Sequence, residues 1–281
     1  MRLTQLVVVS ICCASALAVS AADDSRTVSL AESPAVVQKT INARIGDGKL
    51  GDINASISGG ETVYEVGLTA KDGQERDFTV AGDGTLLSTE VTLDETPATV
   101  QKTIRAQADG WGLESVDKNL DDTEVSYDVE VSKDGRNKTL SIGEDGTLLS
   151  TEITLAEAPA AVQKTIQTQV GNGELKSIVV LFDDYGTNYD VDVAGKDGHD
   201  KGFTVVSDGR LLSEQVSLAA VSPPARKTIK EQIGDGTILR IDKALIERQQ
   251  GVLPYEVQGR KNGKPFDFSV GPRGKFLGMD D

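Results

Sequence analysis

The amino-acid sequence predicts an α+β protein of four tandem repeats, each with one helix packed on a four-stranded antiparallel β-sheet. The first observation is repetition, because similar segments start at Val28, Val91, Ile153 and Val216, at intervals of 63, 62 and 63 residues. A fixed period of this kind indicates one structural unit copied in tandem. The second observation is that the spacing of apolar residues changes within each copy from four to two, as expected for a helix followed by strands.

Each copy begins with a pattern typical of a short helix. In the first copy, Ser33 and Pro34 predict the helix start, with the serine as N-cap and the proline at the first helical position. Gly46 predicts the end, because glycine readily adopts the left-handed conformation that closes a helix. The apolar stripe between them is formed by Val37, Ile41 and Ile45. A Gln-Lys-Thr-Ile segment recurs at Gln38–Ile41, Gln101–Ile104 and Gln163–Ile166, and the fourth copy keeps Lys227, Thr228 and Ile229.

Four strands with one apolar face are expected after each helix. In the first copy Tyr64, Val66 and Leu68 alternate with polar residues, and the Asp83-Gly84 pair predicts a hairpin turn. Because only one face is apolar, the helix is expected to cover it. A repeat of about 63 residues has a small core, so neighbouring repeats are expected to pack together, as pairs that share a longer sheet or in single file.

The N-terminal segment is interpreted as an export signal. Arg2 is its only charge, an apolar run follows, and small residues close it at Ala21 and Ala22. The run is too short and polar for a membrane span, so we expect a cleaved, secreted or periplasmic protein. Lipid attachment through Cys12 or Cys13 is the less favoured alternative, because the required small residue does not precede either cysteine. The predicted divisions are a signal peptide at 1–22 and repeats at 23–90, 91–152, 153–215 and 216–281.

The composition restricts the partners. The chain has 29 basic and 44 acidic residues and a formal net charge of −15. A protein with this much negative charge is not expected to bind nucleic acid or anionic lipid. Its charge favours basic proteins or cations as partners, or serves only to keep the protein soluble. Both cysteines lie in the export signal, so the exported chain is expected to have neither a disulfide nor a thiolate metal site.

Little in the sequence indicates an enzyme. His199 is the only histidine and lies in a predicted hairpin turn, where an exposed polar residue is ordinary. A typical zinc site is excluded without cysteine or a second histidine, and we expect no catalytic residues, cofactor or bound metal. The Asp-Gly pairs are explained by turn geometry rather than calcium, because none has the spacing of an EF-hand loop. These pairs are Asp47-Gly48, Asp83-Gly84, Asp145-Gly146 and Asp208-Gly209.

The polar face of the sheet is the candidate binding surface. Its predicted acidic residues are Glu65, Asp77, Asp128, Glu130, Asp190, Asp192, Glu256 and Asp267. Repeats lying side by side would join them into a patch for a basic protein surface or for weakly bound divalent cations. The alternative is a solvated face that keeps exposed strands from aggregating. Trp111, the only tryptophan, is interpreted either as an interface anchor or as a cover for a neighbouring repeat.

The order of motifs resembles the PepSY-like domains of bacterial exported proteins. In the first copy the motifs are Tyr64-Glu65-Val66, Lys71-Asp72-Gly73, Phe78-Thr79-Val80 and Asp83–Glu90. Their counterparts elsewhere are Tyr127-Asp128-Val129 with Lys133-Asp134-Gly135, Tyr189-Asp190-Val191 with Lys196-Asp197-Gly198, and Tyr255-Glu256-Val257 with Lys261-Asn262-Gly263. The resemblance implies a helix on an antiparallel sheet, similar to one half of the β-lactamase-inhibitor-protein fold, whose tandem units present a concave sheet face to an enzyme.

These observations lead to two functional expectations. The first is an exported, non-enzymatic protein-binding repeat protein whose acidic sheet face inhibits a peptidase or another envelope enzyme. Inhibition is implied by the resemblance alone, because PepSY domains occur in protease propeptides and have no short inhibitory signature that could be matched here. The alternative is a structural role, as an acidic spacer or a low-affinity cation buffer of the cell envelope.

Overall fold

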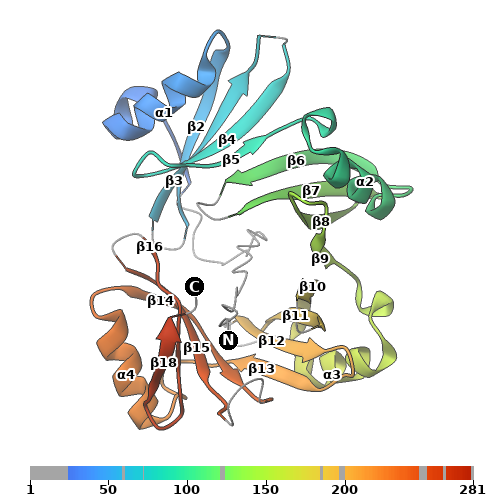
Figure 1. The fold of residues 1–281 in the computed structure, drawn as a ribbon, viewed down its shortest axis with the longest axis vertical. Coiled ribbons are helices and arrows are strands. Elements are labelled where there is room, and N and C mark those ends of the chain that lie inside the picture. The colour runs from blue at the N-terminus through green and yellow to red at the C-terminus, as the bar shows by residue number, and fades with distance from the viewer. Residues whose placement is uncertain are drawn as a thin grey trace, which may run out of the picture. The chain divides into compact units, whose positions relative to one another are not determined.

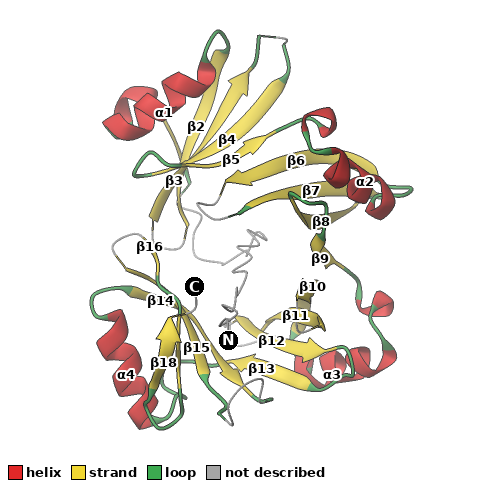
Figure 2. Ribbon diagram, in the orientation of Figure 1, coloured by secondary structure: helices red, strands yellow, loops and turns green. Residues whose placement is uncertain are grey.

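The computed structural model describes residues 25–58, 61–71, 73–120, 124–183, 186–195, 200–246, 252–261 and 264–279. The predicted export signal and His199 lie outside these residues. The chain divides into two compact units, an N-terminal unit ending at Thr151 and a C-terminal unit beginning at Glu152, and each is described by itself. Strands make up most of the regular structure in both units (Figure 2).

The N-terminal unit contains the first two repeats. Its helices are α1 (Ala35–Ile45) and α2 (Ala98–Gln107), each preceded by a short 3-10 turn, η1 (Leu30–Glu32) and η2 (Leu93–Glu95). Its strands are β1 (Arg26–Val28), β2 (Lys49–Ser58), β3 (Glu61–Thr69), β4 (Glu75–Ala81), β5 (Leu86–Glu90), β6 (Gly112–Leu120), β7 (Val125–Lys133), β8 (Arg136–Gly143) and β9 (Leu148–Glu152). From β1 to β9, each strand pairs antiparallel with the next along the chain.

The C-terminal unit repeats this arrangement. Its helices are α3 (Ala160–Val170), which follows the turn η3 (Leu155–Glu157), and α4 (Pro223–Ile233). Its strands are β10 (Glu174–Asp183), β11 (Gly186–Ala194), β12 (Asp200–Val206), β13 (Leu211–Gln215), β14 (Thr237–Ala244), β15 (Tyr255–Lys261), β16 (Lys264–Pro265), β17 (Phe268–Val270) and β18 (Phe276–Met279). Successive strands are again antiparallel, and β15 pairs with both β16 and β17.

The prediction of four repeats that each have their own four-stranded sheet is wrong. The last strand of repeat 1, β5, pairs with the first strand of repeat 2, β6, and β13 pairs with β14 in the same way. The sheet therefore continues across the repeat boundary within each unit, and the chain is mainly antiparallel β-structure with short helices on it. This pairing satisfies backbone groups that an exposed edge strand would leave open. We call β5–β6 the N-terminal seam and β13–β14 the C-terminal seam.

The core of each repeat lies between its helix and the sheet. In repeat 1, Val37 and Ile41 of α1 pack against Val66, Phe78 and Val80, all at most 3% exposed. Equivalent clusters lie under α2, α3 and α4, and each helix lies beside the strands of its own repeat (Figure 1). As the alternation predicts, the helix covers the apolar face of the sheet, so polar residues between the core positions lie on the opposite, helix-free face.

The start of α1 differs from the prediction. Pro34 is the N-cap, and Ser33 instead ends the η1 turn. The Ser33 hydroxyl is buried without a hydrogen bond among the described residues, while its carbonyl accepts a hydrogen bond from the Gln38 side chain at 2.8 Å. The predicted glycine at the helix end is confirmed at Gly46, where φ is 51°.

Candidate functional site

The most strongly repeated residues fasten each helix to a hairpin. The threonine of each Lys-Thr-Ile segment donates a hydrogen bond to the carbonyl oxygen of the glycine in the hairpin turn. These bonds are Thr40–Gly84 at 2.6 Å, Thr103–Gly146 at 2.6 Å, Thr165–Gly209 at 2.5 Å and Thr228–Gly274 at 2.7 Å. The repeated motifs are therefore explained by helix docking, so they do not mark a functional site.

The close approach of helix and hairpin explains why a glycine occupies the turn. Gly146 has φ of +90°, and a Cβ there would lie 2.8 Å from the backbone of Thr99 in the first turn of α2. A side chain at this position would meet both the left-handed backbone and the helix. The contact recurs at Gly84 against Val36.

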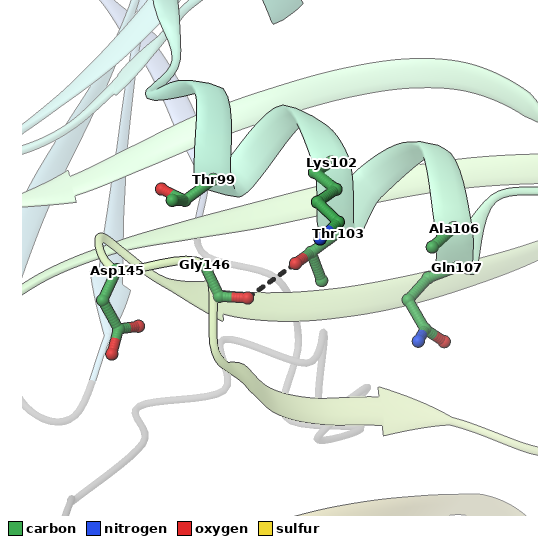
Figure 3. Close-up of a pocket in the computed structure, with 7 residues that line it drawn as sticks. All are labelled: Thr99, Lys102, Thr103, Ala106, Gln107, Asp145 and Gly146. Carbon is green, nitrogen blue, oxygen red and sulfur yellow. Dashed lines mark hydrogen bonds between the residues drawn. The ribbon is translucent and has the colours of Figure 1, made fainter.

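A groove runs beside this contact in repeat 2 (Figure 3). It is lined by Thr99, Lys102, Thr103, Ala106, Gln107, Asp145 and Gly146. Figure 3 shows Thr103 pointing to Gly146, whereas the Asp145 carboxylate points away from the other side chains. Asp145 accepts a hydrogen bond from the Thr147 amide at 2.8 Å, which lowers the pKa of its carboxyl group. The Asp145 carboxylate at this end of the groove therefore serves the turn.

A row of four carboxylates crosses the N-terminal seam on the helix-free face. Glu90 of β5 lies opposite Asp117 of β6, which lies opposite Asp128 of β7. On the other side, the Glu90 carboxylate accepts a hydrogen bond from the Asp77 amide of β4 at 3.1 Å. Side chains directly opposite each other in a sheet have Cβ atoms about 5 Å apart. We call Asp77, Glu90, Asp117 and Asp128 the acidic row.

The acidic row is electrostatically crowded. Burial, followed by the negative charges of Glu90 and Asp128, raises the pKa of Asp117 to about 6, and Asp77 adds to this rise. Burial also raises the pKa of Asp128. A hydrogen bond from the Asn119 amide at 2.8 Å opposes that rise. At neutral pH the charged form of Asp117 is therefore disfavoured by its surroundings.

The corresponding place in the C-terminal seam contains an ion pair. Arg240 Nε donates to Asp242 Oδ2 at 2.6 Å, and the two side chains are 27% and 11% exposed. The guanidinium group lies against Gly202, where a Cβ would come within 2.9 Å of it. Glycine at this position therefore makes room for the arginine side chain.

The two seams correspond residue by residue. The Gly202 amide donates to Gln215 Oε1 at 2.8 Å, as the Asp77 amide does to Glu90, and Gln215 lies opposite Asp242, as Glu90 lies opposite Asp117. The pairs of equivalent positions are Gly67 and Asp192, Asp77 and Gly202, Glu90 and Gln215, Ser115 and Arg240, Asp117 and Asp242, and Asp128 and Glu256. Both seams are therefore rich in carboxylates, but only the C-terminal seam has an arginine among them.

The carboxylates of the C-terminal seam and its arginine stabilise one another. Burial alone would lower the pKa of Arg240, but the hydrogen bond and charge of Asp242, together with the charges of Asp190 and Asp192, raise it. Burial raises the pKa of Asp190, against the effects of Arg240 and of the Thr204 hydroxyl, which donates to it at 2.5 Å. This seam is a compensated network, whereas the acidic row has only carboxylates.

The predicted acidic residues fall into several groups. Asp77 and Asp128 belong to the acidic row, whereas Asp190 and Asp192 surround Arg240. Sequence reasoning missed Glu90, Asp117 and Arg240. The signal that could have identified them is the repeat spacing, which aligns Asp117 with Asp242 across the two units.

The other predicted acidic residues lie outside these two groups. Glu65 and Glu256 are exposed on their strands. Glu130 accepts a hydrogen bond from the Asn137 side chain at 2.7 Å. Asp267 accepts one from the Gly259 amide at 3.2 Å, and burial raises the pKa of its carboxyl group.

Trp111 does not border the acidic row. It precedes β6, is partly buried and packs against the core cluster of its own repeat. The Arg136 guanidinium and the Lys138 ammonium lie 6.0 and 5.9 Å from its ring centroid. Cations at this distance from an indole ring are weakly attracted to it.

Two further features are absent from the described part of the chain. Within it, no group of three or more histidine, cysteine, aspartate or glutamate side chains is arranged to hold a metal ion. In the same residues, no helix combines the length and apolar character needed to cross a bilayer.

Comparison with known proteins gives remote structural likenesses. No family model and no curated protein matches the chain. Similar solved structures include a DUF2874 family protein from Bacteroides ovatus, with 14% identity over 43% of this chain and 86% of that one, at a TM-score of 0.32. A BLIP-like protein from Bacteroides fragilis has 18% identity over 42% and 84%, at 0.31. A protein from Bacteroides thetaiotaomicron, proposed to be periplasmic and calcium-regulated, has 14% identity over 47% and 97%, at 0.28.

These likenesses are too remote to indicate an activity or a partner. The BLIP-like protein is similar to part of this chain, and PepSY membership is not shown by any match. The resemblance to PepSY-like domains therefore still rests on the sequence motifs.

Proposed function

We propose that this protein is a non-enzymatic binding protein that docks a basic protein surface on the helix-free face of its N-terminal seam. The observation that supports this most is the acidic row, in which four carboxylates from β4, β5, β6 and β7 lie side by side. Within the described residues, none of the four makes an ion pair. A cation brought by a partner would relieve their mutual repulsion.

The C-terminal seam indicates which cationic group would fit among the carboxylates of the acidic row. There, Arg240 lies among Asp190, Asp192 and Asp242, and it donates a short hydrogen bond to the last of these. A guanidinium group offers several donors in one plane, which suits neighbouring carboxylates better than a single ammonium group does. We therefore expect an exposed arginine at the centre of the partner's basic surface.

Inhibition is a more specific form of this proposal. If the basic surface surrounds an active site, a bound sheet face would exclude substrate by covering the cleft. The motifs that resemble PepSY-like domains favour a peptidase or another envelope enzyme as the partner. An export signal would place the encounter in the periplasm or outside the cell.

The test is capture of a partner by residues 23–281 from a periplasmic or secreted extract at low salt. In the test variant, the acidic row is neutralised by Asp77→Asn, Glu90→Gln, Asp117→Asn and Asp128→Asn. The matched control removes the same charge from four exposed residues of the same unit, by Asp47→Asn, Asp94→Asn, Asp109→Asn and Asp134→Asn. We expect the control to retain the partner and the test variant to lose it.

Two results would contradict the proposal. If both variants lose the partner equally, net charge alone explains the binding. If no partner is captured and calorimetry shows many weak, similar calcium sites, the protein is instead an acidic spacer or a cation buffer.

A further inference from the structure

The two seams occupy equivalent positions but differ in charge, and this difference has a consequence for the protein alone. We infer that the N-terminal seam is a proton-sensitive joint, which holds repeats 1 and 2 together more tightly at mildly acidic pH than at neutral pH. The C-terminal seam differs at the joint itself, because Gln215 replaces one carboxylate of the cross-joint pair and Arg240 forms an ion pair with Asp242. The inference concerns the stability of the N-terminal unit, so it does not depend on any partner.

The joint between the first two repeats is small, so one unfavourable contact has a large effect on it. The strands β5 and β6 are paired at three positions, Ser88 with Asn119, Thr89 with Lys118 and Glu90 with Asp117. Like charges directly opposite each other destabilise a strand pair. Glu90 and Asp117 form such a pair, and they belong to different repeats. Their repulsion therefore acts across the joint itself.

Neighbouring groups on this face increase the repulsion. Asp77 of β4 and Asp128 of β7 add negative charge from the two flanking strands. The side chains of Ser115 and Asn119 are neutral, and each contacts one carboxylate, Ser115 on Asp117 at 3.5 Å and Asn119 on Asp128 at 2.8 Å. Glu130 of β7 is a further acidic residue, two positions beyond Asp128 on the same face.

The nearest basic side chains do not offset this charge. Arg76 and Lys118 are sequence neighbours of Asp77 and Asp117, so the alternation of a strand directs them to the helix side of the sheet. Arg76 is engaged there, in an ion pair with Glu95 at 3.1 Å.

The C-terminal seam has attraction where the N-terminal seam has repulsion. Gln215 lies opposite Asp242, so one member of the equivalent cross-joint pair is neutral. At the next position, Glu214 lies opposite Lys243, and their side chains form an ion pair at 3.1 Å across the joint. Arg240 then compensates Asp242. The C-terminal joint therefore has no pair of like charges directly opposite each other among its three paired positions.

The direction of the pH effect follows from Asp117. Its pKa in the folded protein is about 6, raised from an ordinary value of 3.8 by burial and by the neighbouring carboxylates. A carboxyl group with a higher pKa in the folded state binds its proton more tightly there, so folding is favoured as pH falls through about 6. The carboxyl groups of Glu32, Glu95 and Asp145 have lowered pKa values, so their effect appears only below about pH 4.5. Within the N-terminal unit, a comparison of pH 7.5 with pH 5.0 therefore reports mainly on Asp117 and Asp128, the two carboxyl groups of the acidic row with raised pKa values.

The experiment uses urea unfolding of residues 23–281 at low salt, followed by the fluorescence of Trp111. This residue is the only tryptophan and packs in repeat 2, so its signal reports the N-terminal unit. We expect the folding equilibrium constant to be roughly three- to tenfold larger at pH 5.0 than at pH 7.5, after allowance for solvent screening of the half-buried carboxyl group. Asp117→Asn should remove most of the difference, with a remainder from Asp128, while the exposed-site control Asp94→Asn should keep it.

A second variant tests the comparison between seams without relying on Asp117. The double substitution Asp77→Gly with Ser115→Arg introduces the two residues found at the equivalent positions of the C-terminal seam. It should raise the urea midpoint at pH 7.5 and reduce the dependence on pH. A wild-type midpoint that is equal at both pH values or higher at pH 7.5 would overturn the inference, as would an undiminished pH effect in Asp117→Asn or in the double variant.

Discussion

The contact between the hairpin glycine and the helix gives the sharpest prediction about stability. In repeat 2, Gly146→Ala places a methyl group at a residue with φ of +90° and within 2.8 Å of backbone and side-chain atoms of Thr99. The substitution therefore combines two separable costs, a strained backbone and an overlap with the first turn of α2.

The structure allows each cost to be estimated. A left-handed backbone costs a residue with a Cβ about 1–2 kcal/mol. Crowding in a packed site adds about 1–3 kcal/mol, because neighbouring backbone must move. Any movement also weakens the hydrogen bond from Thr103 to Gly146, which contributes about 1 kcal/mol. We expect Gly146→Ala to lower the free energy of unfolding of the N-terminal unit by about 3–4 kcal/mol.

Gly135 provides a matched control in the same unit. Its φ is +76°, and nothing lies within 4 Å of the place where a Cβ would be. Gly135→Ala therefore tests the backbone cost alone and should lower the free energy by about 1 kcal/mol. Both variants can be compared with the parent by urea unfolding at pH 7.5, with Trp111 fluorescence as the signal.

The difference between the two variants is the decisive quantity. We expect it to be about 2–3 kcal/mol, which at a urea slope of about 2 kcal/mol per molar corresponds to a midpoint difference of about 1–1.5 M. Equal losses in the two variants would refute the reasoning. In that case the glycine serves only the turn, and helix docking does not explain its presence in every repeat.

Three other substitutions test the remaining interactions. Thr103→Val removes the donor to the Gly146 carbonyl and should cost about 1 kcal/mol in the same assay, with most of the loss recovered in Thr103→Ser. Arg240→Met leaves Asp242 buried without its partner, so amide hydrogen exchange in β14 should become faster by a free energy of about 3 kcal/mol at pH 7.5, whereas unchanged exchange would contradict this role. Asp117→Asn should stabilise the N-terminal unit by about 1 kcal/mol at pH 7.5 and have little effect at pH 5.0, and destabilisation at pH 7.5 would contradict the assigned repulsion.

The elements that could be predicted from the sequence are those with local signals. The four-residue spacing of Val37, Ile41 and Ile45 predicted α1, and Asp83-Gly84 predicted the hairpin between β4 and β5. The predicted role of Ser33 as N-cap was wrong. The backbone N–H of Ser33 closes the preceding η1 turn, and Pro34 is the N-cap of α1. Short-range patterns thus gave the elements of a repeat, but not every detail of how they begin.

Local patterns left the continuity of the sheet open, as one of two arrangements expected for neighbouring repeats. The β5–β6 pair joins strands from different repeats, and the residues that meet there, such as Ser88 and Asn119, are polar and carry no distinctive pattern. Which edges pair is decided by the packing of complete repeats. For this reason the sequence predicted four strands for each repeat but left open whether neighbouring repeats share a longer sheet.

The candidate site was only partly predicted for the same reason. Asp77 and Asp128 could be predicted as part of the acidic face because each alternates with apolar residues in its own strand. Glu90 and Asp117 lie on the two strands that meet at the repeat boundary, so their proximity appears only once the pairing is known. Arg240 is recognisable as a counter-charge only beside Asp242.

The strand pairing across each repeat boundary also affects how the gene for a repeat protein of this kind can change. Within each unit, the final strand of one copy offers the same antiparallel register to the first strand of the next, as Glu90 does to Asp117 and Gln215 does to Asp242. Recombination that inserts or deletes a whole copy would rejoin compatible strands, whereas a break inside a copy would separate a helix from its hairpin. Length is therefore expected to evolve in steps of one repeat, with the charges at each boundary free to diverge afterwards.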